Sequence, residues 1–271
     1  MIAFPNAKIN IGLFIERKRP DGYHDLSTVF YPIPLSDIVE VVRGMETKLT
    51  TYGNAIACAP EKNLVMKAYR CLEADFQLPP VEISLYKHIP DGAGLGGGSS
   101  DAANVLLLLN KEFSLGLDNE ALAEYAACIG ADCPFFIYNK PMVARGIGNL
   151  FTQAGIRLAG YTMVLVKPQI SVPTAVAYAN VHPRNAKVDI EQLIAVPVSE
   201  WKNLLYNDFE DSVFRTYPEL AAIKKMLYDK GATYASMSGS GSAIYALYEN
   251  DNMADAAIAA CQGLKTFKFS L

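Results

Sequence analysis

A glycine-rich segment, residues 90–101 with the sequence PDGAGLGGGSSD, restricts the fold of this chain more than any other feature. It carries five glycines from Gly92 to Gly98 and runs into an apolar stretch with helical spacing. Glycine has no Cβ atom and accepts positive φ, so several backbone N–H groups can turn toward one point. A following helix would add its unpaired amides and the positive end of its dipole. We therefore predict a phosphate site at this loop.

A plain turn followed by a capped helix is the competing interpretation. Ser99, Ser100 and Asp101 are ordinary N-cap residues, and a helix is expected to begin at Asp101. However, a cap needs one such residue and a turn needs one or two glycines. The excess of glycine favours the phosphate site.

The composition indicates a globular protein without a broad anionic partner. Of 271 residues, 51% are hydrophobic and the net charge is −4, which allows a large core and argues against nucleic acid or an anionic membrane as a partner. No apolar run approaches the roughly 18 residues of a spanning helix, and no leader precedes the patterned sequence. We expect a cytoplasmic protein with no obligate protein partner.

Cysteines and histidines form no recognisable metal pattern. The five cysteines are scattered without a C-x-x-C pair, as is typical of reduced thiols, and only Cys128 and Cys133 are close in sequence. His24, His88 and His182 are far apart along the chain. No protein metal site is therefore predicted.

Periodicity and turn residues predict alternating strands and helices. Strands are expected at residues 7–15, 26–33, 38–42, 81–86, 135–138, 142–144, 161–166, 243–248 and 266–269. Helices are expected at residues 63–75, 101–113, 119–129, 173–179, 200–205, 220–230 and 253–261. Gly130 suits the left-handed position that often follows a helix. A turn region at residues 152–160 places a boundary near residue 155, giving domains 1–155 and 156–271.

Two well-known phosphate loops fit this sequence poorly. The P-loop requires a lysine after its glycines, and none follows here. Residues 92–97, GAGLGG, satisfy the dinucleotide pattern G-x-G-x-x-G. A Rossmann strand is apolar throughout, whereas residues 81–86, VEISLY, alternate, and two successive helices are expected after the loop. These observations argue against a dinucleotide site.

A third interpretation of the glycine-rich segment rests on a resemblance that involves three motifs. Residues 90–103 resemble the second motif of the GHMP kinases, small-molecule kinases in which this loop wraps the phosphates of ATP. Residues 7–13, AKINIGL, resemble the first motif of that family, and residues 238–243, SGSGSA, resemble the third. The resemblance spans essentially the whole chain. It implies a two-domain α+β fold with mixed and antiparallel sheets and an active site in the interdomain cleft.

Four shorter stretches resemble one branch of that family: residues 21–24 (DGYH), 63–64 (NL), 130–134 (GADCP) and 171–174 (SVPT). This branch moves the γ-phosphate of ATP to the 2-hydroxyl of a cytidyl-diphosphate methylerythritol. A homoserine or mevalonate kinase remains an alternative, against which DGYH argues. A catalytically silent nucleotide-binding member of the fold is another, against which the presence of Lys8 and Asp132 argues.

Lys8 and Asp132 are the predicted catalytic pair. Local sequence alone favours a surface turn for Asp132, but the resemblance reverses this preference, because it places the catalytic aspartate of the family there. Lys8 lies in an apolar strand, where a buried ammonium needs a carboxylate partner unless the strand is at an edge. Paired with Asp132, Lys8 would stabilise the base and the charge that develops during transfer.

The resemblance also implies the residues that bind the cytidyl substrate. Tyr23 and Tyr178 would stack on the cytosine, and His24 would bond to the edge of the base. Asn10 and Thr174 would lie near the diphosphate or the sugar alcohol. Taken singly, Tyr23 and His24 could close an Asp-Gly turn, and Tyr178 could belong to the core.

For ATP, the resemblance implies that Asn63 and Lys87 line the nucleotide pocket. Asp91 departs from the family pattern, in which this position is small or apolar, and is expected to point to solvent. Mg²⁺ would travel with ATP on phosphate oxygens and water, with the Ser100 hydroxyl as the nearest candidate ligand. The predicted ATP cradle comprises Pro90, Asp91, Gly92, Ala93, Gly94, Leu95, Gly96, Gly97, Gly98, Ser99 and Ser100.

Overall fold

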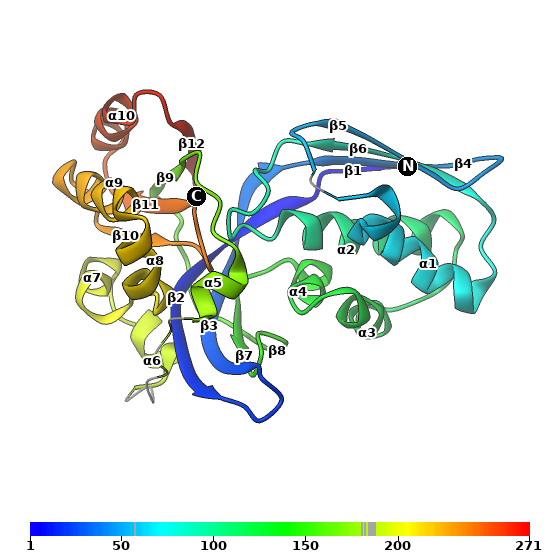
Figure 1. Ribbon diagram of the computed structural model, residues 1–271, viewed down its shortest axis with the longest axis horizontal. Helices are drawn as coiled ribbons and strands as arrows, with labels where there is room; N and C mark the ends of the chain where they lie inside the picture. The colour runs from blue at the N-terminus through cyan, green and yellow to red at the C-terminus, as the bar shows by residue number, and fades with distance from the viewer. Residues whose placement is uncertain (57, 180, 182, 184–187) are drawn as a thin grey trace. The chain divides into compact units, whose positions relative to one another are not determined.

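The computed structural model describes residues 1–56, 58–179, 181, 183 and 188–271, which form two compact units (Figure 1). Unit 1 comprises residues 1–8, 34–91 and 96–140, and unit 2 comprises residues 9–33, 92–95 and 141–271. These units are not the continuous halves expected from the sequence. They interleave because the long strands β2 (Asn6–Lys18) and β3 (His24–Ser36) and the glycine loop each contribute residues to both.

Unit 1 contains a four-stranded mixed sheet with the order β1 (Ile2–Ala3), β4 (Ile38–Arg43), β6 (Val81–Lys87) and β5 (Lys48–Gly53). Strand β4 runs antiparallel to its neighbours, and β5 runs parallel to β6. In β6, burial alternates along the strand, which confirms the expected wet face. Figure 1 shows the helices of the unit on one side of this sheet.

The helices of unit 1 are α1 (Leu64–Phe76), α2 (Gly97–Glu112), α3 (Asn119–Ile129) and α4 (Cys133–Tyr138), preceded by the 3-10 turn η1 (Pro60–Lys62). Helix α2 begins at Gly97, before the expected Asp101. Its N-cap is Gly96 in the left-handed conformation, and no side chain caps it. The interpretation of Ser99, Ser100 and Asp101 as N-caps is therefore wrong, because a glycine takes that position.

Two local expectations around α4 are also wrong. Residues 135–138 were expected as a strand but form part of α4, because Pro134 suits the first turn of a helix and Asn139, with φ of 46°, ends it. Gly130 is not left-handed, since its φ is −177° and its ψ is 153°, so the chain leaves α3 in an extended conformation that any residue adopts. A short apolar run does not distinguish a strand from a buried helix.

Unit 2 contains two sheets. The first has the order β2, β3, β7 (Met142–Arg145) and β8 (Leu150–Gln153). The second is antiparallel, with the order β10 (Tyr234–Met237), β11 (Ile244–Tyr248), β9 (Thr162–Lys167) and β12 (Lys265–Ser270). Every residue of β11 is buried, so its continuous apolar run fits its central position.

The helices of unit 2 are α5 (Thr174–Ala179), α6 (Ile190–Ile194), α7 (Trp201–Leu204), α8 (Phe209–Thr216), α9 (Pro218–Asp229) and α10 (Asp251–Ala260), with the 3-10 turn η2 (Val198–Glu200). Helices α8, α9 and α10 pack on the second sheet and enclose a core that includes Val164, Phe209, Leu227 and Ala246. No periodic pattern predicted β1, β5, β8, β10, α6 or α8. In the described ranges, no helix has the length and apolar character needed to cross a membrane.

Candidate active site

Lys8 and Asp132 lie together in unit 1, as the sequence predicted. Lys8 Nζ is 3.5 Å from Asp132 Oδ2, and the exposed fractions of the two side chains are 4% and 35%. Burial lowers the pKa of the Lys8 ammonium, and the carboxylate of Asp132 opposes this shift. Asp132 lies at the N-cap position of α4 but caps no amide there. Its carboxylate is therefore held by a buried cation and still reachable from solvent.

The glycine loop passes directly over Lys8. Gly96 has φ of 69°, and a Cβ atom there would lie 2.9 Å from Phe136 Cζ and 3.2 Å from Lys8 Cε. At Gly97, a Cβ atom would lie 2.9 Å from Cγ2 of Ile89. Because real Cβ atoms avoid such distances, both positions require glycine. The backbone at Gly96 therefore lies close to the side chain of Lys8.

Lys87 lies below the loop, between two carboxylates. Its Nζ donates to Asp37 Oδ2 and, at 2.6 Å, to Asp101 Oδ2, and all three side chains are buried. The other oxygen of Asp37 accepts from the backbone N of His88 and, at 2.8 Å, of Ile89. This network ties the end of β6 to the first turns of α2. The predicted contact of Lys87 with ATP stays a prediction, since the structure engages its ammonium with these carboxylates.

One ammonium between two carboxylates leaves a negative charge that burial disfavours. Desolvation raises the pKa of Asp101 to about 8, with Lys87 opposing and Asp37 reinforcing the shift. Asp101 Oδ1 has no hydrogen-bond partner among the described residues, and neither has the buried Ser100 hydroxyl. Both groups lie in the first turns of α2, beside the loop.

In unit 2, all three motifs noted in the sequence meet. A Cβ atom at Gly94, whose φ is 76°, would lie 1.9 Å from the carbonyl oxygen of Ser238. Ser238 Oγ donates to Gly94 O at 2.8 Å and accepts from Asn10 N at 3.2 Å. Gly239 completes the contact, since a Cβ atom there would lie 3.2 Å from Asn10 Oδ1. First, second and third motifs are therefore in direct contact at one point.

The residues predicted for the cytidyl substrate also belong to unit 2. His24 and Tyr178 stack with ring centroids 5.0 Å apart and an interplanar angle of 27°. Burial and, to a lesser degree, Lys18 lower the pKa of His24, which favours the neutral imidazole. Tyr23 is 61% exposed, and Thr174 Oγ1 lies 3.4 Å from Ser240 Oγ in the third motif.

Of the other residues predicted to bind ligands, Asn63 and Asn10 make hydrogen bonds within the protein and Asp91 is exposed. Asn63 caps α1, with its Oδ1 accepting from Val65 N at 3.0 Å. The buried side chain of Asn10 donates to Thr28 Oγ1 at 3.1 Å. Asp91 is exposed, in line with the expectation that it points to solvent. Across the described residues, no three His, Cys, Asp or Glu side chains could hold a metal ion, and His182 lies outside those residues.

Comparison with known proteins decides the family. Residues 63–140 match the GHMP kinases N terminal domain, and residues 191–264 match the GHMP kinases C terminal family. The chain belongs to the GHMP kinases. A 4-diphosphocytidyl-2-C-methyl-D-erythritol kinase of Bacteroides fragilis (strain YCH46) is 57% identical over 92% of both chains. One of Porphyromonas gingivalis is 48% identical over 96% of this chain and 97% of its own.

Solved structures agree with this membership. A crystal structure of 4-(cytidine 5'-diphospho)-2C-methyl-D-erythritol kinase superposes with a TM-score of 0.85 at 33% identity, covering 99% of this chain and 98% of that one. The mevalonate kinase of Methanococcus jannaschii gives a TM-score of 0.72 at 14% identity, covering 99% and 97%, and shares the fold alone. The GHMP kinase fold with its mixed and antiparallel sheets is thus confirmed.

Membership of the GHMP kinases implies ATP, and the loop fits a triphosphate. The five glycines from Gly92 to Gly98 have no side chains of their own that could keep a ligand away from the backbone amides. Helix α2, of 16 residues, begins at the loop and adds its unpaired amides. The buried Ser100 hydroxyl, which has no hydrogen-bond partner within the described part of the chain, is a further polar group at this end of the helix. These features suit an anion, and a hydroxyl also suits a hard cation such as Mg²⁺.

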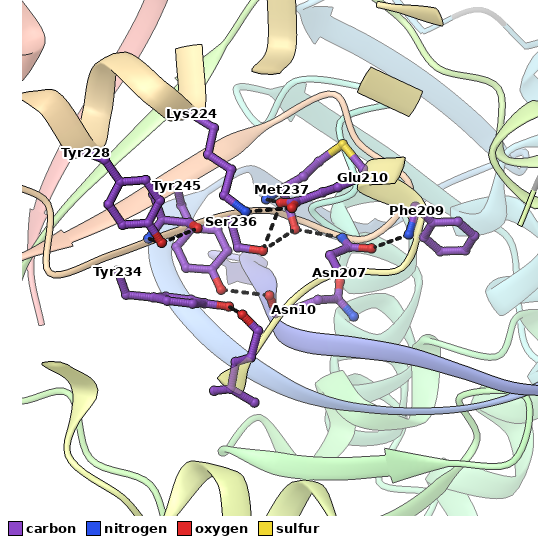
Figure 2. Close-up of polar contacts among 12 residues, drawn as sticks. Asn10, Asn207, Phe209, Glu210, Lys224, Tyr228, Tyr234, Ser236, Met237 and Tyr245 are labelled. Carbon is purple, nitrogen blue, oxygen red and sulfur yellow. Dashed lines mark hydrogen bonds and ion pairs between the residues drawn. The ribbon is translucent and has the colours of Figure 1, made fainter. Parts of the chain in front are cut away.

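In this GHMP kinase, one segment of the site escaped the sequence interpretation. Residues 207–210, NDFE, lead into α8 and are buried. Asp208 bonds to β2, and Asn207 and Glu210 bond to β10 and to the turn of the third motif (Figure 2). No periodic pattern marks them, since their partners lie far away in sequence. Three of the four residues are polar, and their burial becomes visible only in the folded chain.

Proposed function

We propose that this GHMP kinase transfers the γ-phosphate of ATP to the 2-hydroxyl of 4-diphosphocytidyl-2-C-methyl-D-erythritol, a step of non-mevalonate isoprenoid precursor biosynthesis. The observation that carries the chemistry is the Lys8–Asp132 pair, 3.5 Å apart and directly beneath Gly96. The substrate is supported by relatives of 48% to 57% identity that bear this enzyme's name. It is also supported by the aromatic groups of unit 2.

The donor half of the reaction rests on the glycine loop. Phosphoryl transfer depends mainly on positioning and on neutralising the charge of the phosphates. Backbone amides of residues 92–98 and the N-terminus of α2 would bind the β- and γ-phosphates. Mg²⁺, when bound with ATP, would neutralise phosphate charge, and the Ser100 hydroxyl is the protein group suited to hold it.

The acceptor half rests on Asp132. Its carboxylate would orient the 2-hydroxyl and accept its proton as the oxygen forms a bond to the γ-phosphorus and the bond to ADP breaks. Lys8 would fix the carboxylate in place and offset the negative charge of the transferred group. Because Lys8 is buried, it has little freedom to move away from either task.

The cytidyl end would be held by the aromatic groups of unit 2. Tyr178, already packed on His24, presents a rigid ring on which a pyrimidine can stack, and the exposed Tyr23 offers a second ring. A neutral His24 has one donor and one acceptor nitrogen, which suits the edge of cytosine. Asn10 and Thr174 would bind the diphosphate or the sugar alcohol.

The test is a substrate panel with coupled detection of ADP. The purified protein is incubated with ATP, Mg²⁺ and, in separate reactions, the cytidyl substrate, homoserine and mevalonate. We expect ADP release with the cytidyl substrate at a kcat/KM at least about 10³ times that for homoserine or mevalonate, because these alcohols have no cytosine with which to make the base contacts. Release with another alcohol alone would assign a different branch, and ATP binding without turnover on any of them would assign a silent member.

A further inference from the structure

The segment Asn207–Glu210, here called the NDFE segment, lies at the start of α8 in unit 2. Its four side chains are 2% to 8% exposed, and three of them are polar. A buried polar group is costly unless it is hydrogen-bonded, so each must find partners. Figure 2 shows that Asn207 and Glu210 both bond to Met237, the residue that precedes the third motif.

Asn207 holds the turn of the third motif through both of its amide hydrogens. Its Nδ2 donates to Met237 O and to Gly239 O, each at 2.8 Å. Its Oδ1 accepts from Phe209 N at 3.0 Å, so the side chain is fixed at both ends. Two carbonyl oxygens on one side require a donor, which an aspartate could not supply.

Glu210 secures the other side of the same residue. Its Oε1 accepts from Met237 N at 2.8 Å and from Ser236 Oγ at 3.3 Å. Its Oε2 accepts from Lys224 Nζ at 2.6 Å, which compensates the buried charge. Glu210 thus bonds to the N–H of Met237 and Asn207 to its carbonyl oxygen, so the backbone is fixed just before the third motif.

Phe209 and Asp208 contact other parts of unit 2. The rings of Phe209 and Tyr178 make a T-shaped contact, with centroids 4.7 Å apart and an interplanar angle of 81°. Asp208 Oδ2 accepts from Ile15 N at 2.7 Å and thereby fixes β2. Phe209 therefore packs against the ring of Tyr178, while Asn207 and Glu210 support the third motif.

We propose that the NDFE segment is a positioning element that serves two ligands separately. Asn207 sets the Ser238–Gly239 turn against Gly94, and so the ATP loop, whereas Phe209 sets the ring of Tyr178, and so the cytidyl site. The assignment of ligands rests on the proposed function. Neither residue needs to touch a ligand, so each acts through the group that it holds.

The first variant is Asn207→Asp, which keeps the size of the side chain and removes both donated hydrogen bonds. We expect the KM for ATP to rise about tenfold or more, in keeping with the loss of two buried bonds, and the KM for the cytidyl substrate to change less than about twofold. Asn252→Asp, the same change at an exposed position of α10, is the matched control and should change neither.

The second variant is Phe209→Leu, which removes the ring that supports Tyr178. Here the KM for the cytidyl substrate should rise about fivefold or more, while the KM for ATP changes less than about twofold, because the aromatic pair is lost and Asn207 is unaltered. Phe30→Leu, at a residue of β3 that is 3% exposed, is a matched truncation in the core of the same unit. It should lower the melting temperature without separating the two KM values.

Calorimetric titration separates this proposal from the proposed function, because it needs no turnover. A non-hydrolysable ATP analogue should bind Asn207→Asp weakly and Phe209→Leu normally, and cytidine diphosphate should give the reverse. If the wild type binds both but phosphorylates nothing, the proposed function fails while this test still stands. If Asn207→Asp melts below the assay temperature, Asn207→Ser, which retains a single hydroxyl donor, replaces it. Equal losses for both ligands, or none, would overturn the proposal.

Discussion

Lys8 Nζ lies 3.5 Å from Asp132 Oδ2, although the two residues are separated by most of unit 1 in sequence. The cation is buried and the carboxylate is partly open to solvent. Gly96 passes over this cation at a distance that excludes any side chain. The proposed phosphoryl transfer would use the partly open carboxylate to orient the alcohol and the buried cation to offset the charge of the transferred group.

Replacing Asp132 by Asn should lower kcat by about 10² to 10⁴ and leave both KM values within about threefold, because the amide can orient the hydroxyl but cannot accept its proton. Steady-state kinetics with both substrates measure this. Asp229→Asn, at an exposed aspartate that pairs with Lys225, is the matched control and should retain full activity. A fall in kcat of less than about tenfold for Asp132→Asn would remove this residue from the role of base.

Replacing Lys8 by Met should separate activity from stability. The lowered pKa of Lys8 means that folding disfavours its charged form, so the free energy of unfolding at neutral pH should be unchanged or higher in the variant. The kcat should fall by about 10² or more, because the charge beneath the loop is lost. Denaturant unfolding and kinetics on the same preparation check both. A large loss of stability would indicate that Lys8 is mainly structural.

Gly94→Ala should be far more harmful than Gly116→Ala. The φ values are similar, 76° and 72°, but a Cβ atom at Gly94 would overlap Ser238 O, whereas nothing lies within 4 Å of one at Gly116. Backbone strain alone should cost about 1 kcal/mol in Gly116→Ala, by analogy with other left-handed positions. Gly94→Ala should lose more than that in free energy of unfolding, and ATP binding as well. Similar losses in both variants would show that the contact of the motifs is unimportant.

Stability should fall as the pH rises through the titration of Asp101. The pKa of Asp101 is raised to about 8 in the folded protein, above the ordinary value of 3.8 for an aspartate, so the folded state binds the extra proton and this stabilisation is lost as the pH rises between those values. Asp101→Asn removes this titration. Urea unfolding at about pH 5 and about pH 8.5 should show a smaller decrease for the variant than for the wild type. Parallel decreases in both proteins would contradict the assigned pKa.

Much of the site was predictable because its residues carry local signals. Five glycines in a short segment predicted a loop that a phosphate can approach, which stays a prediction, and the structure shows that Gly94, Gly96 and Gly97 also pack closely against protein atoms. A lysine in an apolar strand predicted a carboxylate partner, and Lys8 has Asp132. The start of α2 was harder to predict. Ser99, Ser100 and Asp101 are typical N-cap residues, but the left-handed Gly96 takes the N-cap position instead.

Other parts depend on contacts that no local pattern reveals. The apolar residues of α4 have neither helical nor strand period, and only Pro134 indicated a helix. Asn207 bonds to a carbonyl 30 residues away, so its role exists only in the folded chain. The same holds for Lys87, whose partners Asp37 and Asp101 come from separate elements. Residues that work through distant partners are visible only when the tertiary structure is known.

Phosphorus NMR of the reaction product tests the central claim most directly. The wild type and Asp132→Asn are incubated with ATP, Mg²⁺ and 4-diphosphocytidyl-2-C-methyl-D-erythritol, and the spectra are followed with time. For the wild type we predict a new phosphomonoester signal, assigned to the 2-position by its couplings, that grows in step with ADP while the diphosphate signals of the substrate persist. Asp132→Asn should give this signal at least about 100 times more slowly. Phosphate at another position, or equal rates in the two proteins, would contradict the account.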